Sequence, residues 1–221
     1  MTTDERIPVA RAERHALCDT FLELGPEAPT LCDPWLTREL AAHLVLRERR
    51  PDLAAGMWVP PLKGHLERGQ AQIAGGSWPE LVETVRTGPP WWTPMHFAKV
   101  DALVNTSEFV IHHEDVLRGD GAVGPRREVP ERTARAVLSV LRSGASLMVR
   151  RSPVGVRLVA PGGEPISAGP KSAVAAGRVV TVTGEPVELL LVAAGRMRVA
   201  DVALEGPAED VLALKGASLG V

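Results

Sequence analysis

Residues 107–115 read Ser-Glu-Phe-Val-Ile-His-His-Glu-Asp, and this stretch indicates which kind of site the rest of the fold is expected to position. Glu108 and His112 are four residues apart, so in a helix their side chains lie on the same face, one turn from each other. Both side chains can then point at one metal ion. The stretch therefore predicts half of a metal site.

The residues beside this pair have different expected roles. His113 is rotated about 100° from His112 by the helical period, so the two histidines are not expected to bind the same ion. Asp115 lies three residues after His112 on nearly the same face and is a candidate hydrogen-bond acceptor or extra ligand. For Glu114 and Arg118, the spacing predicts a pair on the helix surface.

Apolar residues recur at helical spacing through the first two thirds of the chain. We expect helices at about residues 9–24, 38–50, 97–117 and 131–149. A further helix is expected between the second and third of these, broken into the segments 60–76 and 77–86. His43 falls on the apolar stripe of the second helix, beside Leu40 and Leu44, and is therefore aimed inward. The proline-rich segment 87–94 is expected to be a loop, and it carries Trp91 and Trp92.

The character of the chain changes near residue 150, where short β-branched segments bounded by glycine and proline begin. We expect strands at 154–159, 179–184 and 199–204, and helices at 187–194 and 207–214. The predicted class is α+β. A helical bundle at residues 1–150 precedes a small α/β module at residues 151–221.

Composition restricts the function classes. The 221 residues are 45% hydrophobic, and the formal net charge of -2 with no run of like charges gives no reason to expect a nucleic-acid partner. The polar N-terminus and the absence of about 18 consecutive apolar residues predict a soluble, cytoplasmic protein without a membrane partner. Cys18 and Cys32 lack CxxC spacing and are expected to be reduced packing groups.

Three inward-facing groups have metal-ligand chemistry: His43, Glu108 and His112. Two histidines and one carboxylate from facing helices would leave positions open for water or substrate on a zinc-type ion, as in a catalytic site. The alternative is a core histidine and a Glu-x-x-x-His spacing that arose by chance. A carboxylate beside Val104 and Ile111 on a buried stripe is costly unless it is paired or coordinates a cation, which favours the metal.

Two segments carry a family resemblance: Trp-Leu-Thr-Arg-Glu-Leu-Ala-Ala-His-Leu at residues 35–44, and residues 108–115. Together they resemble the metal-binding bundle of the DinB-like superfamily, and more closely its actinobacterial branch named after mycothiol-dependent maleylpyruvate isomerase. The resemblance covers nearly the whole chain. It implies an up-down four-helix bundle with an extra helix, followed by a small C-terminal α/β module. It also implies that His43, Glu108 and His112 bind a divalent metal, usually Zn2+, although such ligands also accept Ni2+, Fe2+ or Mn2+.

The resemblance further implies a thiol-dependent transferase or isomerase. In such an enzyme the metal holds the sulfur of a low-molecular-weight thiol such as mycothiol as a thiolate and presents it to a small electrophilic substrate. Trp35, Trp91 and Trp92 are candidates to shape the pocket, with core filling as the alternative role for each. Arg47 is a candidate to bind an anionic substrate or thiol. The sequence does not identify the substrate or the oligomeric state.

A second class of function stays open from the sequence. The chain could be a non-catalytic metal- or thiol-binding protein with a stress or regulatory role. A coordination shell closed by Asp115 or another protein ligand would favour this function, whereas open positions on the metal would favour the enzyme.

Overall fold

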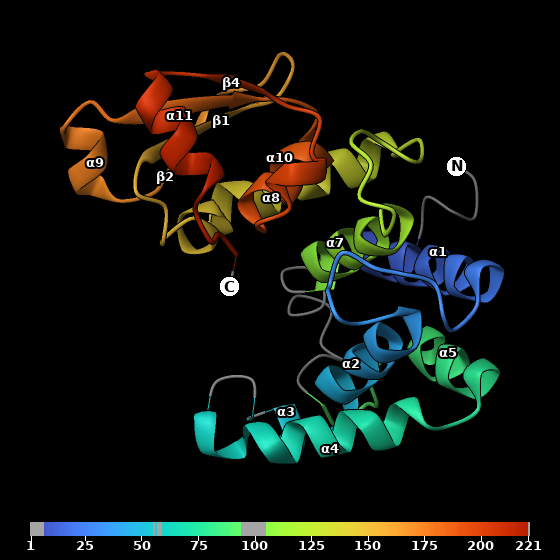
Figure 1. Cartoon of the computed structure of the whole chain (residues 1–221). Helices are drawn as coiled ribbons and strands as arrows, with labels where there is room; N and C mark the ends of the chain where they lie inside the picture. Colours follow the sequence, from blue (N-terminus) through green and yellow to red (C-terminus); the bar gives the residue numbers. More distant parts are fainter. Residues whose placement is uncertain (1–6, 55, 57–58, 94–104, 221) are drawn as a thin grey trace. The chain divides into compact units, whose positions relative to one another are not determined.

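The computed structural model describes residues 7–54, 56, 59–93 and 105–220. The chain divides into two compact units, residues 1–120 and 121–221, which are drawn together in Figure 1. The described residues form many helices and one four-stranded sheet, which confirms the predicted α+β class. The predicted boundary after residue 150 lies inside the second unit, because the helix before it packs on a helix and a strand of that unit.

The first unit is helical. α1 contacts α5 and α7, and α2 contacts α4 and α5. These helices confirm the predicted ones, except that α3 was not predicted and that the first half of the helix expected at 97–117 lies largely outside the described residues. The helices are α1 (Val9–Leu24), α2 (Thr37–Arg49), α3 (Pro51–Ala54), α4 (Lys63–Ala74), α5 (Trp78–Thr87) and α7 (Thr106–Leu117).

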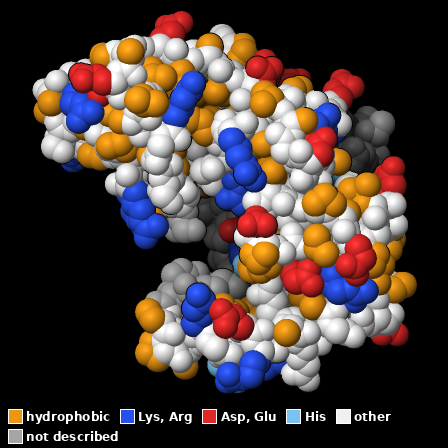
Figure 2. All heavy atoms as spheres, viewed as in Figure 1, with side chains coloured by type: hydrophobic (Ala, Val, Ile, Leu, Met, Phe, Trp, Pro, Cys, Tyr) orange, Lys and Arg blue, Asp and Glu red, His pale blue; other side chains and the backbone are white. Residues whose placement is uncertain are grey.

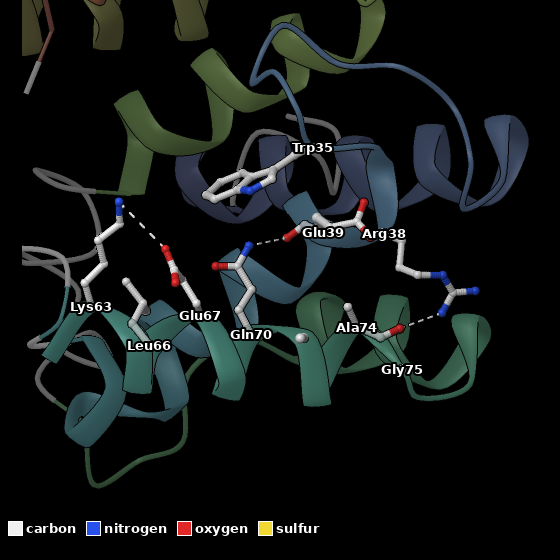
Figure 3. A pocket seen from close by; sticks show the side chains of 10 residues that line it. Trp35, Arg38, Glu39, Lys63, Leu66, Glu67, Gln70, Ala74 and Gly75 are labelled. Carbon is white, nitrogen blue, oxygen red and sulfur yellow. Dashed lines mark hydrogen bonds and ion pairs between the residues drawn. The ribbon is translucent and has the colours of Figure 1, made fainter.

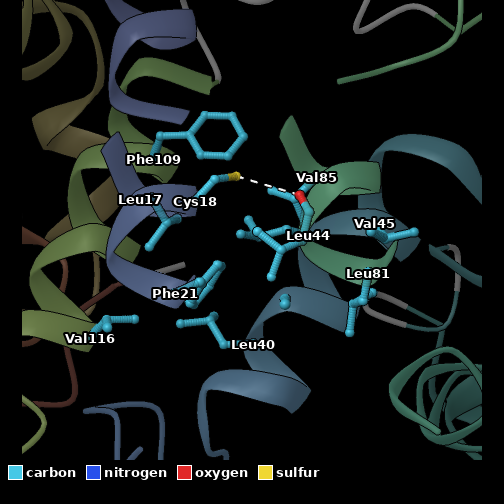
Figure 4. Close-up of a cluster of buried hydrophobic side chains, with 12 residues drawn as sticks. Leu17, Cys18, Phe21, Leu40, Leu44, Val45, Leu81, Val85, Phe109 and Val116 are labelled. Carbon is cyan, nitrogen blue, oxygen red and sulfur yellow. Dashed lines mark hydrogen bonds between the residues drawn. The ribbon is translucent and has the colours of Figure 1, made fainter. Parts of the chain in front are cut away.

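A core of apolar side chains joins four of these helices (Figure 4). Leu17 and Phe21 on α1 are four residues apart, as are Leu40 and Leu44 on α2, so each pair lies on one helix face. These four side chains and Phe109 of α7 are at most 1% exposed. The periodicity visible in the sequence therefore corresponds to the faces that pack together.

A buried ion pair crosses this core between α1 and α2. Both Nη atoms of Arg14 donate to the carboxylate of Glu48, at 2.5 and 2.6 Å. Arg14 also donates to the carbonyl oxygen of Val85 and lies 4.2 Å above the ring of Phe109. Asn105, immediately before α7, donates through Nδ2 to Glu48 Oε1 at 3.1 Å. Charged and amide groups therefore tie three helices together inside the unit.

The pair Glu114–Arg118 was predicted to lie on the surface, and the structure corrects this. Arg118 Nε donates to Glu114 Oε2 at 2.8 Å, and both side chains are 1% exposed. Their burial follows from the loop that precedes α2. A Cβ on Gly119 would lie 2.0 Å from the carbonyl oxygen of Pro29, so this loop runs directly over the end of α7. The i,i+4 spacing predicted the pair, but it could not predict that the loop before α2 would bury it.

The second unit combines α8 with a four-stranded sheet in the order β2-β1-β3-β4. β1 pairs parallel with β3, while β2 and β4 pair antiparallel with their neighbours. Every residue of α10 is buried, as expected for a helix that is apolar on all sides apart from Glu188. The elements are α8 (Glu131–Met148), β1 (Gly155–Val159), β2 (Ile166–Ala168), α9 (Lys171–Ala175), β3 (Val179–Thr183), α10 (Pro186–Ala193), β4 (Ala203–Glu205) and α11 (Ala208–Lys215).

The strand predicted at 199–204 is wrong for most of its length. A 3-10 turn occupies Met197–Val199, and β4 contains only Ala203–Glu205. The backbone N–H of Asp201 donates to the side chain of Glu188 at 2.8 Å, so it is used by a side chain and not by a neighbouring strand. β2 and α9, which are only three and five residues long, were not predicted from the sequence.

The surface carries charges of both signs. On the face in Figure 2, Lys and Arg side chains are interspersed with Asp and Glu, in keeping with the formal net charge of -2. No helix in the described part of the chain is long and apolar enough to cross a bilayer.

Replacing Glu48 should destabilise the first unit strongly. Glu48→Ala leaves the guanidinium of Arg14 buried without its carboxylate, so the free energy of unfolding should fall by about 3–5 kcal/mol. Urea denaturation followed by circular dichroism measures this change. The control is Asp52→Ala, which breaks the exposed pair with Arg50 and should leave the unfolding midpoint nearly unchanged. Equal effects of the two substitutions would contradict this role of the buried pair.

Candidate metal centre

Three predicted ligands lie together in the first unit. His43 comes from α2, and Glu108 and His112 come from α7; one ligand atom from each lies within 4.8 Å of the others. His112 Nε2 is 3.3 Å from Glu108 Oε2. Two ligands at about 2.0–2.1 Å from a tetrahedral zinc ion are about 3.3 Å apart, so this spacing fits a metal ion. We call these three residues the ligand trio.

The ring of His112 is held by a buried carboxylate. His112 Nδ1 is 3.0 Å from Asp115 Oδ2, and Asp115 is fully buried. This hydrogen bond uses the nitrogen that faces away from Glu108 and so leaves Nε2 on the side of the ligand trio. Metal-binding histidines in proteins are commonly oriented by a carboxylate in this way.

Cys32 lies against the same carboxylate, and this contact was not predicted from the sequence. Its Sγ donates to Asp115 Oδ2 at 3.1 Å and is 3.8 Å from His112 Nδ1. Cys32, His112 and Asp115 thus form a second group with metal-ligand chemistry, on the Nδ1 side of the ring. Cys32 also packs against the apolar core, as expected, so its thiol has a polar contact in addition to a packing role, and Cys18 is buried in that core.

The loop before α2 brings Cys32 to this place. Leu31 N donates to the carbonyl oxygen of Asp115 at 2.9 Å, which attaches the loop to α7. Within the loop, Thr30 Oγ1 donates to the carbonyl oxygen of Trp35 at 2.7 Å and accepts from Cys32 N at 3.1 Å. Cys32 and His112 are 80 positions apart, and no spacing in the sequence signals their contact.

Two further predicted residues, Trp35 and Arg47, lie beside the ligand trio. The ring of Trp35 is 5.0 Å from that of His43, centre to centre, and tilted by 37°. Arg47 lies one turn after His43 on α2. Its Nη1 donates to Asn105 Oδ1 at 2.8 Å, and its Nε is 3.7 Å from Glu108 Oε2. A positive charge therefore stands next to the carboxylate of the trio.

Other candidates lie elsewhere. Trp91 is 79% exposed and Trp92 is 54% exposed, and among the described residues neither has a ring contact with the ligand trio. His113 faces α1, where its Nε2 is 2.9 Å from Thr20 Oγ1 and its Nδ1 is 3.6 Å from Glu13 Oε2. The helical period predicted that His113 would point away from the ligands His112 and Glu108, and its contacts with α1 agree with this.

A cavity of about 550 Å³ lies between α2 and α4, with Trp35 along one side (Figure 3). Trp35 also contacts His43, so the same indole ring borders both this cavity and one member of the ligand trio. Polar groups are available at its edge, because Gln70 and Glu67 rise from α4 toward the indole in the same view. Its lining is formed by Trp35, Arg38, Glu39, Lys63, Leu66, Glu67, Gln70, Ala71, Ala74 and Gly75.

The charges of the ligand trio follow from its surroundings. Burial, together with the charge of His112, lowers the pKa of His43 to about 4. Burial alone would raise the pKa of Glu108, but the hydrogen bond with His112 and the charge of Arg47 outweigh it and lower the pKa to about 2. Burial likewise opposes the charge of His112, yet hydrogen bonds to Asp115, Cys32 and Glu108 hold its pKa well above 6.5. Without metal, His112 is therefore protonated at neutral pH between two carboxylates.

These shifts predict that the metal-free protein is most stable near pH 6.5. Unfolded His43 binds more protons than folded His43 between pH 6.5 and 4, so stability falls as the pH drops through this range. Folded His112 binds more protons than unfolded His112 above pH 6.5, so stability falls as the pH rises through its folded pKa. Each group contributes a slope of at most about 1.4 kcal/mol per pH unit.

Urea midpoints of chelator-treated protein between pH 4 and 9 test this profile. His43→Ala should flatten the acid side and His112→Ala the alkaline side. A profile that neither substitution changes would contradict the assigned charges.

Comparisons with known proteins identify the fold. No family model matches the sequence, and no curated protein matches it. Among solved structures, the crystal structure of the mycothiol-dependent maleylpyruvate isomerase superposes with a TM-score of 0.56 at 16% identity, covering 94% of this chain and 98% of that one. A histidine-to-alanine mutant of that isomerase superposes with a TM-score of 0.52 at the same identity and coverage. The chain thus has the fold of the mycothiol-dependent maleylpyruvate isomerase, which is the fold that its motifs predicted.

Proposed function

We propose that His43, Glu108 and His112 bind a divalent metal ion, most simply Zn2+, with Ni2+, Fe2+ or Mn2+ as alternatives. The observation that carries this proposal is the trio itself: three ligand atoms within 4.8 Å, with His112 oriented by Asp115. Neutral His43 and ionised Glu108 are already in the protonation states that a metal requires. Only the proton on His112 has to leave.

The proposed coordination shell is open. Asp115 and Cys32 approach His112 from Nδ1, and the two ring nitrogens point in opposite directions. Neither can therefore complete the shell of an ion on Nε2. Three protein ligands with at least one free position are the arrangement of catalytic metal sites, whereas structural sites are closed by four.

We further propose that the protein is a thiol-dependent transferase or isomerase that acts on a small electrophile, with mycothiol as the candidate thiol. The fold shared with a mycothiol-dependent isomerase supports this proposal. A zinc ion at the trio would supply a Lewis acid that keeps a bound thiol ionised near neutral pH. The chain supplies the rest: Asp115 fixes the ring of His112, and Trp35 borders both His43 and a cavity with room for the non-reacting part of a ligand.

A second candidate function rests on Cys32. If the metal were held by Cys32, His112 and Asp115 instead, the ion would lie deeper in the protein, because Asp115 is fully buried. Such a site would suit a non-catalytic metal-binding protein with a stress or regulatory role. The donors of this group already satisfy one another, since Asp115 accepts from both Cys32 and His112. We therefore favour the trio with His43.

Cobalt substitution tests the proposal. Wild-type protein should take up one equivalent of Co2+ and should develop a thiolate-to-cobalt charge-transfer band when mycothiol is added. His43→Ala and His112→Ala should each lose the metal by elemental analysis, because each removes one of only three ligands. Cys32→Ser is the matched control and should keep both the metal and the band. A full equivalent of metal in both histidine variants would refute the site, and a loaded protein without the band would refute the thiol chemistry.

A further inference from the structure

Arg47 holds hydrogen-bonding capacity that the protein leaves unused beside the ligand trio. Its side chain is 9% exposed. Its Nη2 is buried and, within residues 7–54, 56, 59–93 and 105–220, has no hydrogen-bond partner. A buried cationic N–H without an acceptor is costly, so its retention points to an acceptor that arrives with a ligand.

The geometry of the guanidinium shows where this capacity points. Nε–H and one N–H of Nη2 lie side by side and form the fork that accepts two oxygens of a carboxylate. Nε is 3.7 Å from Glu108 Oε2, longer than a hydrogen bond, so this edge faces the ligand trio without being saturated by it. The opposite nitrogen, Nη1, is occupied by Asn105.

The fork is held in place by groups that do not neutralise it. Asn105 accepts from Arg47 through Oδ1 and donates through Nδ2 to Glu48. Both oxygens of Glu48 are already bound by Arg14, so its charge is directed at Arg14. Arg47 is therefore positioned in advance, which reduces the entropy lost when it binds an anion.

We propose that Arg47 recognises the carboxylate of a small ligand whose other end binds at the ligand trio. This inference rests on the proposed metal site and adds the chemical class of its ligand. A single carboxylate matches the two-pronged fork, and Glu108 close by disfavours a dianion such as phosphate. Arg47 then determines specificity, whereas the trio holds the reacting end.

The competing role is that Arg47 only orients Glu108. Loss of Arg47 would then weaken metal binding and affect all ligands equally. The proposed role requires a selective loss for ligands that carry a carboxylate, so a ratio of affinities separates the two.

Matched pairs of small ligands test this on the cobalt-loaded full chain. The first pair is 3-mercaptopropionate and 3-mercapto-1-propanol, read from the thiolate-to-cobalt band. The second pair is imidazole-4-acetate and 4-methylimidazole, read from the d–d bands, and it makes the same comparison without sulfur. The variants are Arg47→Gln, Arg47→Lys, which keeps a charge and a donor for Asn105, and Arg50→Gln. Arg50 is exposed and controls for the loss of one charge.

Wild-type protein and Arg50→Gln should bind the carboxylate member of each pair about 10- to 100-fold more tightly, as expected for a two-pronged charged hydrogen bond. Arg47→Gln should reduce this preference to about threefold or less, and Arg47→Lys should retain only part of it. Unchanged preference in Arg47→Gln and Arg47→Lys overturns the inference.

The failures can be told apart. If no thiol gives the band while the imidazole pair shows the Arg47-dependent preference, the thiol chemistry fails and the carboxylate site stands. If both thiols give the band with equal affinity in wild-type protein, the carboxylate site fails and the thiol chemistry stands. A wild-type protein that takes up no cobalt overturns both.

Discussion

The candidate site depends on one hydrogen bond, between Nδ1 of His112 and the carboxylate of Asp115. Asp115 is fully buried, so its charge has to be balanced by donors within the protein. His112 and Cys32 provide them. The hydrogen bond that offsets the cost of burying this carboxylate also fixes the imidazole ring, so that Nε2 faces Glu108 and His43. Without Asp115, the ring could turn and the trio would lose its geometry.

This hydrogen bond belongs to a longer series of polar contacts inside an apolar bundle. Arg14 binds Glu48, Asn105 links Glu48 to Arg47, and Arg47 stands beside Glu108. The series joins α1, α2 and α7, which are three of the four helices whose apolar faces form the core. Stability and chemistry are therefore coupled. Arg14, Glu48 and Asn105 are held where they are because leaving one of them unpaired would cost several kcal/mol. The same constraint positions Arg47 beside the trio.

Much of this could be predicted from local patterns. Apolar periodicity located the helices, and the four-residue spacing of Glu108 and His112, with His43 on another inward-facing stripe, indicated the trio. The helices and the pairing of Glu108 with His112 could be predicted because each depends on neighbours within one or two helical turns. That His43 lies beside this pair depends on a contact between α2 and α7, and metal binding by the trio stays a prediction. The rotation of His113 away from His112 followed from the same period.

What could not be predicted depends on contacts between distant segments. Cys32 reaches His112 because Leu31 bonds to the backbone of Asp115 and Gly119 allows the loop to approach, and no local spacing encodes this. The burial of Glu114 and Arg118 has the same origin. Trp91 and Trp92 were candidates because of their size, but the side chain that borders both the cavity and His43 is Trp35. The cavity lies between two helices, so neither helix alone predicts it.

The central claim is that the metal is bound on the Nε2 side of His112, by His43 and Glu108, and not on the Nδ1 side by Cys32 and Asp115. X-ray absorption at the zinc edge of thiol-free protein tests it most directly, because zinc–sulfur distances of about 2.3 Å are distinct from zinc–nitrogen and zinc–oxygen distances of about 2.0–2.2 Å. Binding at the trio predicts a shell of nitrogen and oxygen alone, identical in wild-type protein and Cys32→Ser. A sulfur neighbour in the wild-type spectrum that disappears in Cys32→Ser would contradict it.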